Sequence, residues 1–451
     1  MRRPIVSPGP LSQALLALVA CIGFLSSPCS ANDAQLADDY IPRLETMLMD
    51  NIGSFWLDKA IDQTYGGYLI DFDAQGVPGS GSTKMIVTQA RTVWLFSQMV
   101  RTGFGGAAHL AGAEHGYRFL RDKMWDREHG GFYWQVDRTG DRKLQPLKHL
   151  YGQAFGLYAL SEYYLAGHDP NALALATELF DLLERKAHDK RHGGYVEFFQ
   201  RDWSAPPDTA TGYLGVPASM KLMNTHLHLL EALTTYYEAS RSTLALERLG
   251  ELILVESDTM IVKPIGAATD KYDLDWTRRL DSGYAVVSYG HDIENVWLLM
   301  KACEVAGLSN SILNGFYQYA YDNSYRYGYD ATHGGYYDAG PLGQPANSLN
   351  KTWWVQAEAL VSALYMYRLT GSTRYLSVFE TTYDFVDKHL ADWEHGEWHS
   401  RVAADGSGPS GAKGQDWKCG YHNGRAMIEC IGVLRALKAK AEQAAPQRRR
   451  Q

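Results

Sequence analysis

The stretch His192-Gly-Gly-Tyr195 (HGGY) recurs along the chain and decides the fold. Copies of the same pattern, two glycines before an aromatic residue, stand at 65–68 (YGGY), 129–132 (HGGF) and 333–336 (HGGY), with a weaker copy at 395–398 (HGEW). The copies are about 60–70 residues apart, except for one interval of about twice that length, so we expect a degenerate copy near Gly266. A fixed period of this length is typical of repeat architectures, and here it predicts six units.

The segments between these copies have apolar residues at helical spacing. They are 88–100, 151–165, 172–184, 224–238, 293–305 and 353–369. Apolar residues that recur every three or four positions indicate helices, so each unit holds about two of them. Glycines supply the unusual backbone angles of short β-hairpins or turns between the helices. We therefore predict an all-α fold, an (α/α)6 barrel with hairpins and loops at the mouth of a central cavity; an open solenoid is the alternative.

The N-terminal segment has the features of an export signal. Arg2 and Arg3 precede the apolar residues 15–25, and small residues follow up to a cleavage position after Ala31. Residues 1–31 are predicted to be a cleaved signal peptide or, alternatively, a lipoprotein signal that would anchor the protein through Cys21. We expect an exported protein, periplasmic or extracellular, without a membrane span, because the apolar stretch is too short to cross a bilayer.

The amino-acid composition narrows the classes of molecule that the protein is expected to bind. The 451 residues carry a formal charge of −8 without a long basic stripe, which argues against nucleic acid. The 12 tryptophans and 29 tyrosines suit stacking on sugar rings, although core packing explains them equally well. We expect a small-molecule substrate, a monomer or weak dimer, one catalytic domain over residues 32–440 and a disordered basic tail at 441–451. The three cysteines after residue 31 exclude a disulfide framework.

Four predicted helix or loop segments carry an unusual polar load inside apolar patterns. In 223–232 one stripe holds Asn224, His228 and Glu231, and His226 points elsewhere. The segments 288–300, 351–359 and 416–425 add histidine, glutamate and tryptophan. A lone inward histidine is more often a hydrogen-bonded core residue than a catalyst. Polar stripes on separate inner helices of one ring must converge, however, and burying unsatisfied polar groups costs about 1 kcal/mol or more each. The pattern therefore indicates a functional cavity.

These four segments, together with the helical segment at 88–97, contain motifs that resemble those of the N-acylglucosamine 2-epimerase superfamily, in particular its cellobiose 2-epimerase branch. They are TQARTVWLFS (88–97), MNTHLHLLEA (223–232), SYGHDIENVWLL (288–299), KTWWVQAEA (351–359) and DWKCGYHNGR (416–425). The resemblance runs in order from about residue 36 to 438. It implies 2-epimerisation at the reducing-end sugar, with glucose becoming mannose, in disaccharides such as cellobiose.

The resemblance also implies residue roles. His291 and His422 would be the acid–base pair, and His228 would assist ring opening. The remaining implied site residues hold the reducing-end sugar, orient the histidines or shape the sugar subsites: Arg91, Tyr151 and Asn224; Glu294 and Glu358; Trp354 and Trp417.

Histidine suits this chemistry. Opening the sugar ring unmasks an aldehyde at C1, so the C2 proton becomes removable and leaves an enediolate. Two groups on opposite faces are needed, and imidazole titrates near pH 6.5, so either group acts in either direction. Glu294, one helical turn from His291, would fix its tautomer, and Arg91 would stabilise the oxyanion.

No cofactor or metal is expected. The reaction needs no redox step, and the G-x-G-x-x-A match at 103–108 follows a helical segment, not a strand. The motifs His228-x-x-Glu231 and His291-x-x-Glu294 reverse the Glu-x-x-His order of di-metal helices. Three alternatives stay open: a monosaccharide 2-epimerase or aldose–ketose isomerase acting on mannose or N-acylglucosamine, a glycoside hydrolase using Glu294 and Glu358, and a sugar-binding protein without turnover.

Overall fold

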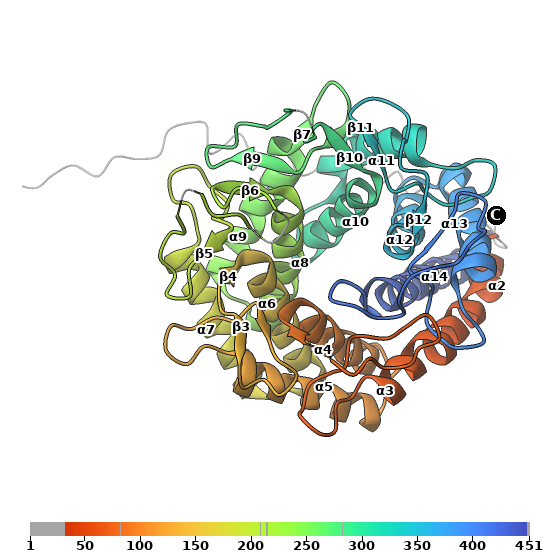
Figure 1. Cartoon of the computed structure of the whole chain (residues 1–451). Coiled ribbons are helices and arrows are strands. Elements are labelled where there is room, and N and C mark those ends of the chain that lie inside the picture. The colour runs from red at the N-terminus through yellow and green to blue at the C-terminus, as the bar shows by residue number, and fades with distance from the viewer. Residues whose placement is uncertain (1–31, 82, 208, 213–214, 282, 449–451) are drawn as a thin grey trace, which may run out of the picture.

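The computed structural model describes residues 32–448, apart from 82, 208, 213–214 and 282. It is a ring of helices in two concentric layers (Figure 1). The inner layer consists of α4 (Ile86–Arg101), α6 (Leu150–Gly167), α8 (Met223–Ser240), α10 (Tyr289–Val305), α12 (Trp353–Thr370) and α14 (Tyr421–Arg448). The outer layer consists of α2 (Asn32–Thr46), α5 (Ala107–Phe119), α7 (Pro170–Lys186), α9 (Thr243–Leu254), α11 (Asn314–Gly328) and α13 (Thr373–Phe385). The predicted (α/α)6 barrel and all six predicted helical segments are confirmed.

The two layers differ in how the sequence is patterned. Inner helices such as α6 are buried on every side, which explains their nearly continuous apolar composition. Outer helices such as α7 bury only one stripe. Their starts are fixed locally: Asp169 caps α7 ahead of Pro170, and Ser242 caps α9 by accepting a hydrogen bond from the Ala245 amide at 3.3 Å.

The ring closes between the two ends of the described chain. Helix α2 packs against α14, the last inner helix, and α14 also contacts α4. Ion pairs tie the first junction, with Arg435 binding Glu45 at 2.8 Å and Lys438 binding Asp38 at 2.5 Å. Closure excludes the open solenoid.

Short elements link the helices at the two ends of the ring. The turns of helix are η1 (Met47–Gly53), α3 (Ser54–Lys59), η2 (Leu120–Met124), η3 (Val255–Thr259), η4 (Asn310–Leu313) and η5 (Val386–Leu390). The strands are β1 (Lys84–Met85), β2 (Gln135–Val136), β3 (Lys143–Gln145), β4 (Lys148–His149), β5 (Phe198–Phe199), β6 (Met220–Leu222), β7 (Ile261–Val262), β8 (Ala267–Ala268), β9 (Lys271–Asp273), β10 (Val286–Ser288), β11 (Ala339–Pro341), β12 (Lys351–Thr352) and β13 (Arg401–Val402). They form small antiparallel sheets, β1-β2-β3, β4-β5, β6-β9, β7-β8, β10-β11 and β12-β13.

The repeated glycines belong to one hairpin that each inner helix clamps. In the first unit, Gln89 of α4 accepts a hydrogen bond from the Tyr68 amide at 2.8 Å and donates one to its carbonyl at 2.9 Å. Lys84, just before α4, reaches Asp62 at 2.9 Å. Gly67 has φ +65°, and a Cβ there would lie 2.6 Å from the Gln89 Oε1 atom, so glycine is required on both counts.

The same clamp recurs with substitutions. Gln153 and Gln356 bind the amides of Phe132 and Tyr336. In the third unit His226 replaces glutamine and accepts from the Tyr195 amide at 3.0 Å, which confirms that His226 points away from the stripe of His228.

The degenerate fourth copy predicted near Gly266 is present. Gly266 has φ +78°, and β7 pairs with β8 around it. Asp292 of α10 takes the glutamine's place by accepting from the Ala268 amide at 3.1 Å, and an apolar Val287 stands where the other units have lysine. With no lysine beside it, burial raises the pKa of Asp292 to about 8.

The ends of the chain need one correction. The tail predicted to be disordered from 441 is helical as far as Arg448, because Ala, Glu and Gln are good helix formers that extend α14. Residues 449–451, the export signal at 1–31 and Cys21 lie outside the described residues. In the part of the chain described, no helix combines the length and apolar character needed to cross a bilayer. Cys303, Cys419 and Cys430 are buried free thiols.

Candidate active site

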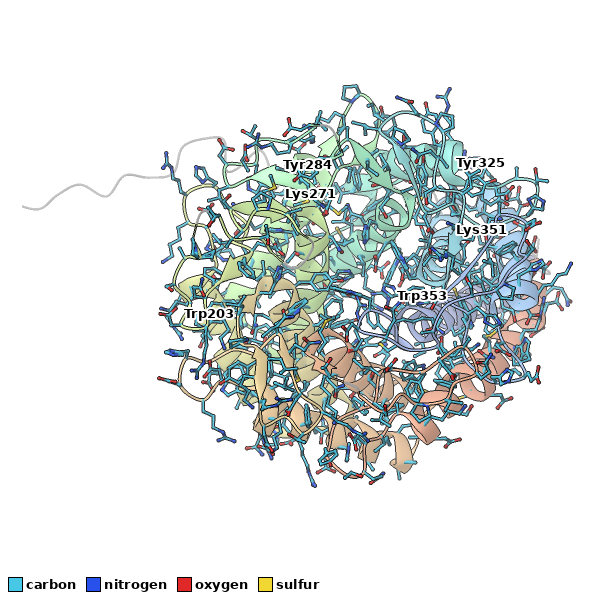
Figure 2. The ribbon with its side chains drawn as sticks, viewed as in Figure 1. Trp203, Lys271, Tyr284, Tyr325, Lys351 and Trp353 are labelled. Atoms are coloured by element: carbon cyan, nitrogen blue, oxygen red, sulfur yellow. The ribbon has the colours of Figure 1, made fainter. Side chains whose placement is uncertain are left out.

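A cavity of about 180 Å³ lies at the hairpin end of the ring, among the first residues of the inner helices. Every site residue predicted from the sequence lines it except the two glutamates, and Trp353 is an addition. The lining is Arg91, Tyr151, Asn224, His228, His291, Trp353, Trp354, Trp417 and His422. Figure 2 shows Trp353 near the centre of the ring. Six helices and one loop therefore contribute to one small space.

Two of the three histidines are backed by carboxylates. His422 Nδ1 lies 2.7 Å from Glu358 Oε1, and His228 Nδ1 lies 3.0 Å from Glu231 Oε2. Burial raises the pKa of Glu358, but Arg425 and Trp297 donate hydrogen bonds to its carboxylate and favour the charged form. An ionised carboxylate only accepts hydrogen bonds, so each Nδ1 carries the proton and each Nε2 keeps a lone pair. Burial lowers the pKa of His228 and holds that of His422 well below its usual range, so both rings are neutral near pH 7.

One arginine joins the carboxylates behind the cavity. Arg425 of α14 binds Glu358 at 2.8 Å, and it also binds Glu231 and Glu294. Burial raises the pKa of Glu231, but the Arg425 charge and the His228 hydrogen bond lower it more, to about 2. Burial and then the charge of Glu358 hold the pKa of Glu294 well above its usual range. Arg425 thus stabilises the charges that orient the two histidines, while Glu294 retains a proton.

His291 has a different environment. Its ring lies 4.7 Å from that of Trp354, centroid to centroid, and burial lowers its pKa to about 4, an effect that Asp270 opposes. Among the described residues no hydrogen bond to its ring nitrogens is recorded. The expectation that Glu294 fixes the His291 tautomer is wrong, because the Glu294 side chain binds Arg425 and no hydrogen bond to His291 is present among the described residues. The spacing of three residues put both side chains near one face, but the buried cation drew Glu294 away.

Arg91 is held rigidly with its charge toward the cavity. It donates to the Tyr151 hydroxyl at 3.0 Å and to the Trp417 carbonyl at 3.2 Å. Its guanidinium lies between the rings of Phe155 (4.3 Å) and Tyr421 (4.8 Å). Its buried Nε has no partner among the described residues, and neither does the Oδ1 atom of Asn224. Both atoms are almost fully buried, so the cavity wall contains two unsatisfied polar atoms.

A metal does not suit the one cluster that could hold it. In the described part of the chain, ligand atoms of Glu294, Glu358 and His422 lie within 4.8 Å of one another. The Arg425 guanidinium already binds both glutamates, so these carboxylates are occupied by a fixed cation.

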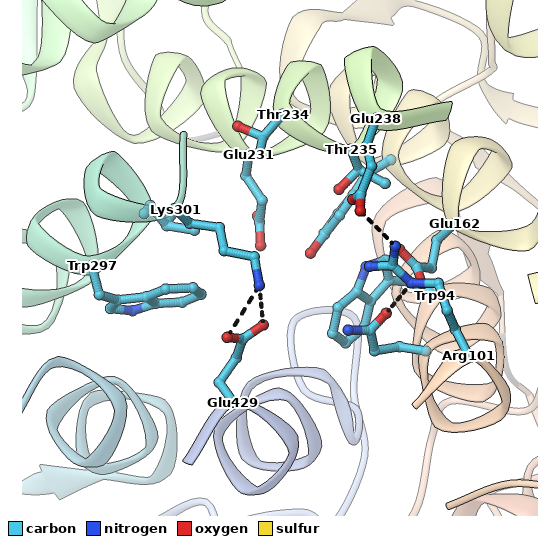
Figure 3. Close-up of a pocket in the computed structure, with 13 residues that line it drawn as sticks. Trp94, Arg101, Glu162, Glu231, Thr234, Thr235, Glu238, Trp297, Lys301 and Glu429 are labelled. Carbon is cyan, nitrogen blue, oxygen red and sulfur yellow. Dashed lines mark hydrogen bonds and ion pairs between the residues drawn. The ribbon is translucent and has the colours of Figure 1, made fainter. Parts of the chain in front are cut away.

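A second, smaller cavity of about 30 Å³ lies deeper in the ring, on the far side of Glu231 (Figure 3). Two sets of ion pairs flank it: Lys301 with Glu429 at 3.1 Å, and Arg101 with Glu162 at 2.7 Å and with Glu238 at 3.2 Å. This volume matches about one water molecule. A sugar cannot pass through it, so substrate reaches the histidines from the hairpin end.

Besides Trp353, two components of this site were not predicted from the sequence. Arg425 was inside the quoted motif DWKCGYHNGR without a role, although a charged residue in the largely apolar stretch at the start of α14 signals a buried ion pair. Asp270, which accepts a hydrogen bond from the Asn224 amide at 2.9 Å, lies in a loop with no motif, so no signal pointed to it.

The comparisons with known proteins agree with this fold. The sequence profile of the N-acylglucosamine 2-epimerase (GlcNAc 2-epimerase) family matches residues 66–426. The cellobiose 2-epimerase of Bacteroides fragilis is 32% identical over 390 residues, which cover 86% of this chain and 98% of that protein. The structure of cellobiose 2-epimerase from Spirochaeta thermophila is 34% identical with a TM-score of 0.81, covering 90% of this chain and 99% of that one. The D-mannose isomerase of Marinomonas mediterranea is 25% identical over 402 residues, 85% of this chain and 94% of that protein.

Proposed function

Because the chain belongs to the N-acylglucosamine 2-epimerase family, we propose that it interconverts glucose and mannose at the reducing end of β-1,4-linked disaccharides. It is a carbohydrate epimerase or isomerase, as its relatives are. The proposed reaction on cellobiose yields glucosyl-mannose. Four features of the structure support this choice: the paired imidazoles, the fixed arginine, the position of the glutamates and an outer cleft.

The first step is ring opening. The O1 hydroxyl loses its proton to the lone pair of His228 Nε2, the C1–O5 bond breaks, and O5 takes up a proton. The T-shaped contact of His228 with Tyr151, 5.2 Å between ring centroids, places this base beside the residues that hold Arg91. The product is an open-chain aldehyde, whose C2 proton is acidic enough to be removed by imidazole.

Epimerisation follows at C2. One of His291 and His422 removes the C2 proton, and the electron pair moves to O1 as an enediolate that Arg91 stabilises. The other imidazole, which takes up a proton from solvent on its cavity-facing nitrogen, donates that proton to the opposite face of C2. The first imidazolium releases the C2 proton to solvent, so both rings end neutral. Their low pKa values make a protonated imidazole a strong acid, and the neighbouring enediolate favours its transient formation.

The observation that carries the proposal is the position of His291 and His422 around Trp354. Their ring centroids lie 4.7 and 5.7 Å from that of Trp354, although they come from α10 and α14. Two neutral imidazoles beside one aromatic platform suit a single hexose carbon reached from two sides.

An outer cleft favours a disaccharide over a monosaccharide. Trp417 lines the catalytic cavity and also a cleft of about 380 Å³ with Ile70, Asp71, Thr83 and Gln415. A second sugar linked to the reducing-end unit would occupy this cleft. The Asp71→Ala variant should therefore raise KM for cellobiose and leave proton exchange on free glucose unchanged.

The glutamates argue against a hydrolase. Glycoside hydrolysis needs two carboxylates flanking the scissile bond. Glu294 and Glu358 both bind the same guanidinium and do not line the cavity. Neither is free to protonate a glycosidic oxygen.

Incubation with cellobiose in D2O tests the proposal. We expect glucosyl-mannose with deuterium at C2, detected by NMR. Glucose alone would indicate a hydrolase, a ketose product an isomerase, and unlabelled cellobiose a binding protein. A parallel panel of lactose, mannobiose, glucose, mannose and N-acetylglucosamine fixes the preferred sugar, and faster turnover of a monosaccharide would overturn the disaccharide assignment.

A further inference from the structure

The largest of the cavities described here is not the catalytic one. A cavity of about 470 Å³ lies on the outer rim between α11 and two loops, 264–265 and 342–344. Figure 2 labels Tyr325, on the same helix, at the outer edge of the ring. Pockets that bind small molecules have volumes of about 300–1,000 Å³, so this cavity is large enough for a ligand.

One face of α11 forms the floor. Tyr319, Asp322, Asn323, Arg326 and Tyr327 are three or four positions apart and share that face. Tyr319 is 43% exposed, and its ring is fixed from behind by Gly266, where an added Cβ would lie 2.9 Å from the ring. The degenerate hairpin of the fourth unit thus leaves room for an exposed tyrosine.

Asn323 is a polar group without a protein partner. Its side chain is only 5% exposed, and neither its Nδ2 nor its Oδ1 atom makes a hydrogen bond among the described residues. A buried amide left unsatisfied costs about 1–3 kcal/mol per group. Both atoms are almost inaccessible to water, so a ligand in the cavity would satisfy this donor and acceptor once the amide turns toward it.

The charges that line the cavity are balanced. Asp322 is ion-paired with Arg374, outside the cavity lining. Arg326 has a cation–π contact with Tyr327, at 5.3 Å, and no ion pair is recorded for it among the described residues. The lining holds one carboxylate and one guanidinium, so its formal charge is zero and a neutral polyhydroxyl compound is compatible with it.

We infer that this outer cavity is a second saccharide-binding site, in which a sugar ring stacks on Tyr319 and its hydroxyls bind Asn323, Arg326 and Gln344. Tyrosine offers an apolar face with a polar edge, and planar amide and guanidinium groups match vicinal hydroxyls. The inference rests on the carbohydrate enzyme class, not on the choice of disaccharide.

The position of the outer cavity indicates what a second saccharide site would do. Leu342 follows β11, which pairs with β10, and β10 leads directly into α10 with His291. The outer cavity is therefore on the hairpin side of the ring, the side from which substrate enters. An oligosaccharide held there raises the local concentration of reducing ends near the mouth.

Calorimetric titration with cellotetraose tests the inference. The wild-type protein should show two classes of site. Tyr319→Ala should weaken the outer one by about tenfold or more, and Tyr319→Phe should retain it because the stacking face remains. Asn323→Ala is a second variant for the same site. Cellobiose turnover should stay within about twofold of wild type in Tyr319→Ala, since Tyr319 lies outside the catalytic cavity.

The matched control is Tyr65→Ala, which removes a tyrosine of similar exposure (45%) outside the outer cavity. It should leave both classes of site intact. Trp417→Ala should weaken the inner site and spare the outer one. A single class of site, abolished by Trp417→Ala and unchanged by Tyr319→Ala, would overturn the inference. That result says nothing against epimerisation, which the D2O experiment tests separately.

Discussion

The two walls of the catalytic cavity orient their histidines in different ways. On the wall formed by α8, α12 and α14, His228 and His422 are each hydrogen-bonded to a glutamate, and Arg425 joins the glutamates. On the α10 wall, His291 packs against Trp354 and is influenced by Asp270 only through its charge. The α10 wall also belongs to the unit whose hairpin has lost its lysine and glutamine. The two proposed bases are therefore unequal: His422 is oriented by hydrogen bonding and His291 by packing.

The largest expected effect comes from removing either proposed base. His291→Ala and His422→Ala should each lower C2 proton exchange by about 10²–10⁴-fold, because each removes the imidazole proposed for one face of C2. Exchange is measured by NMR in D2O, and thermal unfolding checks that the fold is intact. A near-normal rate in one variant would assign catalysis to the other wall alone.

Removal of Arg425, which binds the glutamates behind His228 and His422, should cause the largest decrease in the free energy of unfolding. Arg425→Met leaves the buried Glu231 and Glu358 carboxylates without their cation, and unfolding should become easier by about 3–5 kcal/mol. Lys301→Met, which removes a partly exposed ion pair with Glu429 at the far end, is the matched control and should cost less. If urea titrations gave equal decreases in the free energy of unfolding for the two variants, the central position given to Arg425 would be refuted.

Substitution of the two glutamates of the predicted site should change kcat to different extents. Glu358→Gln should lower kcat by about 10–100-fold, because a neutral amide no longer stabilises the His422 imidazolium. Glu294→Gln should change kcat less than about threefold, since Glu294 already holds a proton and touches neither base. Equal effects would restore the expectation that Glu294 orients His291.

The smallest expected effect is on the pH dependence of kcat/KM. The pKa of His291 is lowered to about 4, so the imidazole stays neutral as pH falls from 7 to 5.5, where an ordinary histidine is about 90% protonated. The acid limb of kcat/KM should therefore lie below pH 5.5. Protonation favours the unfolded state, in which histidine titrates near 6.5, so unfolding should become easier below that pH. An acid limb at pH 6.5 would show that His291 is not desolvated in solution.

Much of this arrangement could be read from local patterns. The HGGY copies gave the number of units, and even the degenerate copy near Gly266 followed from the spacing. The histidines were identifiable because each interrupts an apolar helical pattern. The pairing of Glu294 was predicted wrongly, since a spacing of three residues states which side chains are neighbours but not which one a distant cation attracts.

Periodicity and glycine positions are local properties of the chain, so they were sufficient to predict the helix pairs, the ring and most of the polar residues that line the cavity. The pairing of each histidine with its carboxylate, the role of Arg425 between them and the outer cavity beside α11 could be recognised only in the folded molecule. These features depend on contacts between residues far apart in sequence, such as Arg425 and Glu231, and on the low dielectric of the interior, where a buried charge takes whichever partner packing brings within reach.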